Sequence, residues 1–136
     1  MPADHPNRPA VLVSRCLLGI PCRYHGRKTT PWGKPIGRPS LITRLRARYR
    51  IVDVCPECDS GMPTPRPPTR IVSGRWICDG RDVTDRFRHG AEIALATALR
   101  EGCQRAYLLR GSPACDREYG MCGQLLKKHG IKVIAV

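Results

Sequence analysis

Three short apolar runs rich in β-branched residues each lead into a cysteine, and this pattern constrains the fold more than any other feature of the chain. The runs are AVLVSR, RIVDV and AYLLR, and the cysteines that follow them are Cys16, Cys55 and Cys115. Runs of this length and composition predict buried strands. If the strands are parallel, their carboxyl ends lie side by side at the edge where open α/β sheets bind ligands. Three thiols at this edge suggest a metal or iron–sulfur centre with room for a fourth, non-protein ligand.

The stretches between these runs alternate with them as in an α/β fold. Strands are predicted over residues 10–15, 50–54, 106–110 and 131–136. Apolar residues at helical spacing predict helices over residues 41–49, about 85–100 and 121–129. The expected end residues are Ser40 as N-cap of the first helix, Thr84 or Asp82 as N-cap of the second, Gly102 at the end of the second and Gly130 as C-cap of the third. This order predicts a mostly parallel sheet with helices on both faces.

Two long segments lack a strong helix or strand pattern. Residues 16–40 are rich in glycine and proline and predict a long functional loop. The segment PECDSGMPTPRPPTR after Cys55 is rich in proline, which predicts a stiff, extended loop without helix or central strand. Beyond it, two apolar runs around Ser73-Gly74 predict a hairpin.

With 136 residues, the chain is long enough to bury one core without disulfides. No apolar run approaches the ~20 residues that span a bilayer, and the first residues lack the apolar stretch of a signal peptide. We therefore expect a soluble, cytoplasmic protein with one domain over residues 10–136 and a disordered tip over residues 1–9. The eight cysteines would then be reduced, and clustered thiols in such a compartment bind metal or do chemistry. Cys78 and Cys103 are interpreted as buried and inert.

The net charge of +13, from 24 Lys and Arg against 11 Asp and Glu, favours an anionic partner. Arginines concentrate over residues 44–50 and recur over residues 66–88, so the positive field is broad. Such a field suits nucleotides or RNA, but basic charge alone does not distinguish between them.

Cys55 and Cys58 form a CxxC pair, and three interpretations of it are open. A structural zinc site requires a second CxxC or a histidine pair as well. A thioredoxin-like redox site requires the pair to open a helix. A cluster site requires only one of the two thiols, together with cysteines from other loops.

Two polar residues lie on the same predicted loops as the cysteines. Glu57 is two residues beyond Cys55, and a carboxylate held near a metal centre can move protons. Ser112 is three residues before Cys115, so its hydroxyl is expected to face the same crevice. The alternatives are an ordinary surface ion pair for Glu57 and a turn role for Ser112.

Four segments together resemble the thiouracil desulfurases, a bacterial family: SRCLLGIPCRYHG (14–26), VCPECDSGMPTPRPP (54–68), DGRDVTDRF (79–87) and GSPAC (111–115). The resemblance implies a compact Rossmann-like three-layer domain with a 4Fe-4S cluster held by three cysteines. The fourth iron of that cluster accepts the sulfur of a thiolated uracil. Carried onto this chain, the resemblance assigns Cys16, Cys55 and Cys115 as ligands, and Glu57 and Ser112 as acid/base and substrate-activating residues. Cys22 matches a position that family members often fill otherwise, and Arg15 stands where a small residue is common.

The expected function is therefore removal of sulfur from a thiolated uracil compound, as free base, thiouridine, nucleotide or RNA. Arg23 and Arg66 are candidates, by charge, for binding a phosphate or carbonyl of the substrate. The basic surface is also compatible with contact to tRNA. One alternative is a non-catalytic zinc or iron–sulfur protein with a basic RNA-binding face, and another is a thiol redox protein that uses Cys55 and Cys58.

Overall fold

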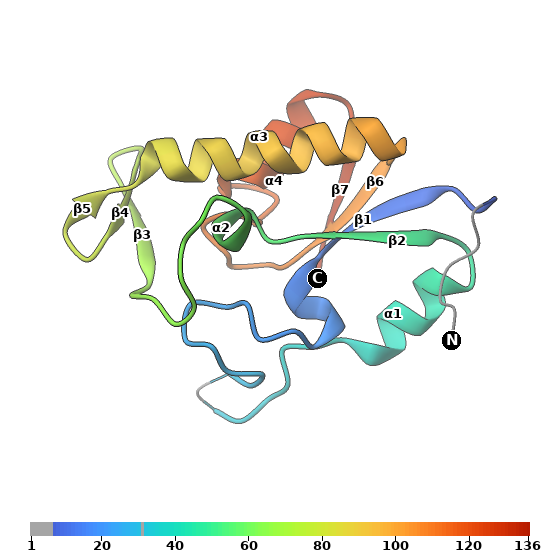
Figure 1. Cartoon of the computed structure of the whole chain (residues 1–136), viewed down its shortest axis with the longest axis horizontal. Coiled ribbons are helices and arrows are strands. Elements are labelled where there is room, and N and C mark those ends of the chain that lie inside the picture. Colours follow the sequence, from blue (N-terminus) through green and yellow to red (C-terminus); the bar gives the residue numbers. More distant parts are fainter. Residues whose placement is uncertain (1–6, 31) are drawn as a thin grey trace.

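A parallel sheet of four strands forms the centre of the structure, a computed structural model that describes residues 7–30 and 32–136. The strands lie in the order β2-β1-β6-β7 (Figure 1). Their bounds are Ala10–Ser14 for β1, Arg50–Val54 for β2, Arg105–Leu108 for β6 and Lys132–Ala135 for β7. The predicted parallel sheet is confirmed, with strand ends shifted by at most two residues. Residues 1–6 of the predicted tip lie outside the described residues.

Helices cover both faces of this sheet and give the predicted three layers (Figure 1). Helix α1 (Pro39–Arg46) packs on one face, and α3 (Thr84–Glu101) and α4 (Met121–Lys128) lie together on the other. Side chains along β1 alternate between the two cores. Leu12 packs in the core formed by α3 and α4, whereas its neighbours Val11 and Val13 pack in the core formed by α1. This alternation is expected of a strand that is buried on both faces.

The order of the strands places a topological switch point at β1. The chain passes from β1 through α1 to β2 on one side, and later returns through α3 to β6 on the other side of β1. Loops that leave a sheet in opposite directions at such a point open a crevice at the carboxyl ends of the strands. The loops that carry Cys16, Cys55 and Cys115 all start at this edge.

A small antiparallel sheet lies beside the main one (Figure 1). It consists of β3 (Thr69–Val72), β4 (Arg75–Cys78) and β5 (Arg81–Asp82). The predicted hairpin is confirmed, since Ser73 and Gly74 both have positive φ, at 48° and 75°, between β3 and β4. The third strand, β5, is only two residues long and was not predicted.

The proline-rich segment after β2 contains a helix, contrary to the prediction. The one-turn helix α2 (Pro56–Asp59) follows Cys55 directly. Pro56 occupies the first turn of this helix, where its missing N–H has no intrahelical partner to lose. Similarly, β1 ends one residue early because a 3-10 helix, η1 (Arg15–Leu18), begins there.

Three of the predicted end residues were wrong and one was confirmed. Ser40 does not cap α1, because Pro39 begins the helix and Arg38 takes the cap position. His129, not Gly130, is the C-cap of α4. Gly102 ends α3 in a left-handed conformation, as predicted.

The predicted N-cap of α3 was wrong, because neither Thr84 nor Asp82 holds that position. Val83 holds the cap position, and the backbone amide of Thr84 donates to Oδ1 of Asp82 at 2.9 Å. Asp82 therefore satisfies one free amide of the helix from one residue further out than a standard cap.

Two cysteines outside the predicted site, Cys78 and Cys103, are buried as predicted. Both lie in the core beneath α3 and α4, and all eight cysteines are free thiols.

Over the ranges that the structure describes, no helix has the length and apolar character needed to cross a membrane.

Candidate active site

Every residue predicted for the site lines one pocket at the carboxyl edge of β1, β2 and β6. The pocket is lined by Ser14, Arg15, Cys16, Cys22, Arg23, Val54, Cys55, Pro56, Glu57, Arg66, Leu109, Ser112 and Cys115. The topology accounts for this convergence, because the three strands are neighbours and their loops leave from the same edge.

Arg15 connects the loop of Cys16 to the loop of Cys55. Its Nε donates to Oδ1 of Asp53 at 2.6 Å, and its Nη1 and Nη2 donate to the two carboxylate oxygens of Asp59 at 2.9 and 3.2 Å. Asp59 Oδ2 also accepts the backbone amide of Cys55 at 3.1 Å. Burial alone would lower the pKa of Arg15, but the carboxylates of Asp59 and Asp53 outweigh it and raise the pKa. Arg15 thus fixes the distance between two of the cysteine-bearing loops.

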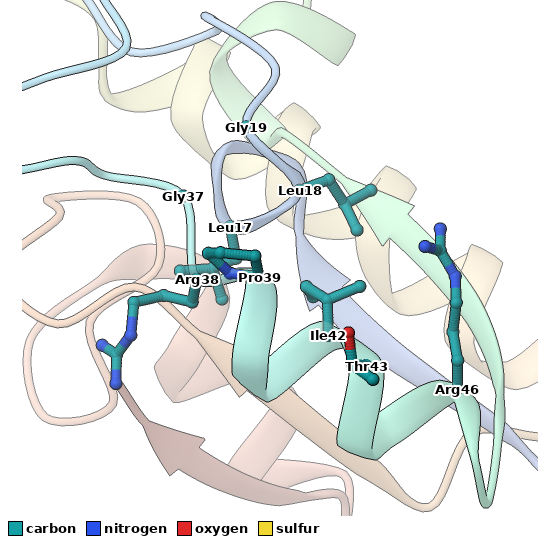
Figure 2. Close-up of a pocket in the computed structure, with 9 residues that line it drawn as sticks. All are labelled: Leu17, Leu18, Gly19, Gly37, Arg38, Pro39, Ile42, Thr43 and Arg46. Carbon is teal, nitrogen blue, oxygen red and sulfur yellow. The ribbon is translucent and has the colours of Figure 1, made fainter.

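Helix α1 supports η1 from outside the pocket. The backbone amide of Arg38 donates to the carbonyl of Leu17 at 2.9 Å, and the side chains of Leu17 and Ile42 share one core. Figure 2 shows the groove of about 330 Å³ along this junction, lined by Leu17, Leu18, Gly19, Gly37, Arg38, Pro39, Ile42, Thr43 and Arg46. None of the residues predicted for the site lines this groove, which lies beside the site where α1 packs against η1.

Helix α2 presents Glu57 to the pocket. The Glu57 carboxylate accepts Nε of Arg66 at 3.0 Å, and the two side chains are only 9% and 2% exposed. The other guanidinium nitrogens of Arg66 donate to the carbonyls of Cys22 at 2.9 Å and Pro63 at 3.1 Å and to the hydroxyl of Thr64 at 2.9 Å. Burial would lower the pKa of Arg66, but the charge of Glu57 raises it. Arg66 was predicted to bind substrate, and these contacts instead favour a role in positioning Glu57.

Helix α3 holds α2 in place through a close backbone contact at Gly90. A Cβ on Gly90 would lie 2.1 Å from the carbonyl oxygen of Pro56 and 2.8 Å from its carbonyl carbon. Only a residue without a side chain permits this approach. Because Cys55 precedes α2 and Glu57 lies within it, Gly90 sets the position of both.

The loop after β6 turns around Ser112, which is buried. Its Oγ accepts the amides of Ala114 at 3.1 Å and Cys115 at 3.0 Å. With both lone pairs in use, the hydroxyl can act only as a donor. Ser14, the last residue of β1, accepts the amide of Leu109 at 2.9 Å. Burial raises the pKa of the Cys115 thiol to about 11, and hydrogen bonds from the hydroxyls of Ser14 and Ser112 oppose this shift.

The backbone of α4 lies in close contact with the same loop at Gly123. A Cβ there would lie 2.1 Å from the carbonyl oxygen of Asp116 and 2.8 Å from that of Cys115. The side chain of Asp116 accepts the amides of Gly111, Glu118 and Tyr119. The loop that carries Cys115 is therefore fixed both by its own hydrogen bonds and by its contact with α4.

A further cysteine, Cys22, lies among the predicted ligands. The neighbouring thiol of Cys16, followed by burial, raises the pKa of Cys22 to about 12, and the thiol of Cys55 opposes this shift. The thiol of Cys22 and burial also raise the pKa of Cys55 well above its usual value. Burial raises the pKa of Cys58, whose thiol contacts the hydroxyl of Thr64 at 3.3 Å. The pair does open a helix, α2, as a thioredoxin-like site requires. The raised pKa values of both thiols disfavour that interpretation, because redox-active CxxC pairs have a lowered thiol pKa.

The donor groups of the pocket fit an iron–sulfur cluster. Thiolates are the usual ligands of such clusters, and coordination to a metal deprotonates a thiol whose pKa is raised. Three arginines line the same pocket. Arg15 and Arg66 are paired with carboxylates, whereas Arg23 has no ion pair among the described residues, so its charge can offset that of the thiolates. Within residues 7–30 and 32–136, no three His, Cys, Asp or Glu side chains are arranged around a single metal ion. Cluster ligands each bind a different iron, so they need not converge on one point.

An open cleft of about 540 Å³ adjoins the pocket and shares Arg23 and Leu109 with it. Its lining includes two further arginines, Arg38 and Arg110, and the rings of Tyr24, His25 and Trp32. The guanidinium of Arg23 lies 5.8 Å from the centroid of the Tyr24 ring. The ring of Trp32 is 75% exposed. Cations and accessible aromatic faces together suit an anionic ligand that has a planar ring.

The sequence matches the profile of the 2-thiouracil desulfurase family over residues 11–135. The chain belongs to the 2-thiouracil desulfurase family. All the residues predicted for the site lie within this match, and the resemblance stated from four sequence segments is confirmed.

Two individual proteins are also similar to this member of the 2-thiouracil desulfurase family. An uncharacterised protein of Bacillus subtilis (strain 168), YbbK, is 29% identical in an alignment that covers 92% of this chain and 94% of YbbK. The solved structure of a 4Fe-4S-dependent thiouracil desulfidase, TudS, matches with a TM-score of 0.76 and 34% identity, over 94% of this chain and 91% of TudS. The chain and both relatives therefore correspond over nearly their whole lengths.

Sequence reasoning missed several residues that shape this desulfurase-family pocket. Ser14 is the polar last residue of a buried strand, and that position is itself a signal for a site at a sheet edge. Gly90 lies inside a helical pattern, where a glycine often marks a packing contact. The link from Arg15 to Asp53 and Asp59 had no comparable signal, because it depends on which loops the fold brings together.

Proposed function

We propose that this chain is a desulfurase that converts the C=S group of a thiolated uracil to C=O with a 4Fe-4S cluster held by Cys16, Cys55 and Cys115. The observation that carries the proposal is the pocket itself, in which three thiols from three loops lie beside a buried carboxylate at the switch point of the sheet. A cluster bound there would supply an iron that none of these three cysteines holds, and this iron would act as a Lewis acid toward a thiocarbonyl sulfur. Similarity to TudS supports this assignment.

Glu57 is the proposed base of the reaction. Arg66 holds Oε1 of Glu57, which leaves Oε2 to take a proton from the water that attacks the thiocarbonyl carbon. When substrate is bound, the single proton of the Ser112 hydroxyl turns from the Cys115 sulfur to the uracil ring, while the oxygen keeps the two amides that it accepts. The oxygen of water bonds to carbon, the C–S bond breaks, and the products are a carbonyl compound and hydrosulfide. No electrons are gained or lost overall.

We take the substrate to be a nucleotide rather than a free base. The cleft beside the pocket has the size of a small-molecule site, and a thiolated ring in the pocket would leave that cleft to a sugar phosphate. Arg23 lines both spaces, which supports its predicted role in substrate binding. Arg38 and Arg110 offer charge-assisted hydrogen bonds to a phosphate.

This proposal predicts a selective effect of Arg110→Ala. Loss of one phosphate contact is expected to raise the KM for a thiouridine monophosphate by about tenfold, the scale of one hydrogen bond to a charged group. The kcat for the nucleotide, and both constants for free thiouracil, should stay unchanged. Arg105→Ala is the matched control, because Arg105 lies at the other end of β6. Equal effects of Arg110→Ala on nucleotide and free base would show that the cleft does not bind phosphate.

The function itself is tested by reconstituting the protein anaerobically with iron and sulfide and adding a thiouracil or thiouridine monophosphate. We expect release of one hydrosulfide for each uracil product, and no release from protein without iron. A fully loaded cluster that releases no sulfide from any of these compounds would favour the non-catalytic alternative.

We also propose a cytoplasmic location, because all eight cysteines are free thiols and thiols persist in reducing compartments. Contact with tRNA stays a prediction from the net charge of +13.

A further inference from the structure

We propose that Cys22 is a displaceable fourth ligand, which binds the iron not held by Cys16, Cys55 or Cys115 as long as no substrate is present. The inference rests on the proposed function, since it assumes that the cluster is bound in this pocket. It gives Cys22 a role in controlling access to the reactive iron.

The first observation is the position of Cys22. Its side chain lines the pocket together with the three proposed ligands, although it comes from a stretch of loop beyond η1. The residue is 7% exposed, and its side chain shares the pocket with those of Cys16 and Cys55. The cysteines outside the site differ in this respect, since Cys78, Cys103 and Cys122 pack among apolar residues of the core beneath α3 and α4.

The second observation is that the backbone of Cys22 is fixed. Its carbonyl accepts Nη2 of the buried Arg66 at 2.9 Å, and its amide donates to the carbonyl of Ile20 at 2.8 Å. The same guanidinium holds Glu57 at 3.0 Å. One buried cation therefore anchors both the proposed base and the loop of the fourth thiol, and Cys22 can release a ligand bond without leaving the pocket.

The third observation separates Cys22 from Cys58, the other nearby thiol. The sulfur of Cys58 contacts the hydroxyl of Thr64 at 3.3 Å and the carbonyl of Cys22 at 3.5 Å, and Cys58 does not line the pocket. Cys22 is therefore the one thiol that completes a four-cysteine set among the residues lining this pocket, and four cysteines are the usual ligands of a 4Fe-4S cluster.

The exchange balances without an oxidant or reductant. The bond from iron to the Cys22 sulfur breaks as a bond to the substrate sulfur forms, and the released thiolate takes up one proton from solvent. When hydrosulfide has left, Cys22 returns that proton and binds iron again. A soft thiolate suits this role, because the incoming ligand is also a soft sulfur.

The test measures loss of iron from the loaded cluster. Wild type, Cys22→Ala and the control Cys103→Ala are loaded anaerobically and treated with ferricyanide, and the EPR signal of a three-iron cluster is followed with time. We expect Cys22→Ala to lose its fourth iron about tenfold faster or more, the scale on which removing a supporting group weakens a metal site. The control should match wild type. Thiouracil added to wild type should accelerate the loss, because it displaces Cys22.

Each outcome bears on one proposal. If wild type binds no four-iron cluster, the proposed function is wrong. If wild type binds the cluster and Cys22→Ala loses iron at the same rate, the function stands and the role of Cys22 is wrong. Should Cys22→Ala fail to fold, Cys22→Ser replaces it; serine keeps the size of the side chain and binds iron less strongly, so faster loss is again expected, and a wild-type rate again refutes the role.

Discussion

Glu57→Gln is expected to lower the rate of sulfide release by about 10²–10⁴-fold, the usual contribution of a positioned base. Glutamine keeps the shape of the side chain and can still accept Nε of Arg66, but it cannot take a proton from water. The iron content of the loaded protein should stay unchanged, because Glu57 is not among the proposed ligands. The measurement is steady-state sulfide release at saturating substrate, with iron determined on the same sample.

The ion pair between Glu57 and Arg66 complicates this variant. Removing one partner of a buried pair costs about 3–5 kcal/mol of stability, and both side chains are nearly inaccessible. Glu57→Asp is therefore the second variant, since it keeps the charge and withdraws the carboxylate from the substrate. Glu101→Gln, which breaks the ion pair with Arg50 away from the pocket, is the matched control. Wild-type rates in both Glu57 variants would refute the assignment of the base.

Gly90→Ala is expected to displace α2 and with it both Cys55 and Glu57. In an open helix this change would add about 0.5–1 kcal/mol of stability. Here the new Cβ would lie 2.1 Å from the Pro56 carbonyl oxygen, so the helices must separate. We expect a net loss of about 1–3 kcal/mol, typical of overpacking, and a fall in kcat of about 10²-fold, typical of misplacement by about 1 Å.

Thermal unfolding and sulfide release of Gly90→Ala together separate the two effects. Glu92→Ala changes an exposed residue of the same helix and should leave both quantities near wild type. A Gly90→Ala protein with wild-type activity would show that α2 tolerates the shift and that Gly90 does not position the site.

The core strands and the convergence of the cysteines could be predicted because both depend on local patterns. Apolar runs rich in β-branched residues mark buried strands wherever they occur. Parallel strands then place their carboxyl ends together whatever the length of chain between them. This is why Cys16 and Cys115, far apart in sequence, could be assigned to one pocket.

The parts that were missed depend on contacts between distant segments or on competing local signals. The count of prolines after Cys55 suggested an extended chain, but the position of Pro56 at the start of α2 decides the structure of that turn. The contacts of Arg66 also could not be read from its charge. Its buried contacts to Glu57 and the Cys22 carbonyl depend on how two loops meet.

The most direct test of the central claim is the iron and acid-labile sulfide content of protein purified without oxygen. Cys16→Ser, Cys55→Ser and Cys115→Ser are each compared with wild type and with Cys103→Ser, a buried cysteine outside the pocket. We predict about four irons per chain in wild type and in the control, as expected for a 4Fe-4S cluster, and loss of the cluster in each of the three pocket variants. A full complement of iron in any one of those three would contradict the ligand assignment.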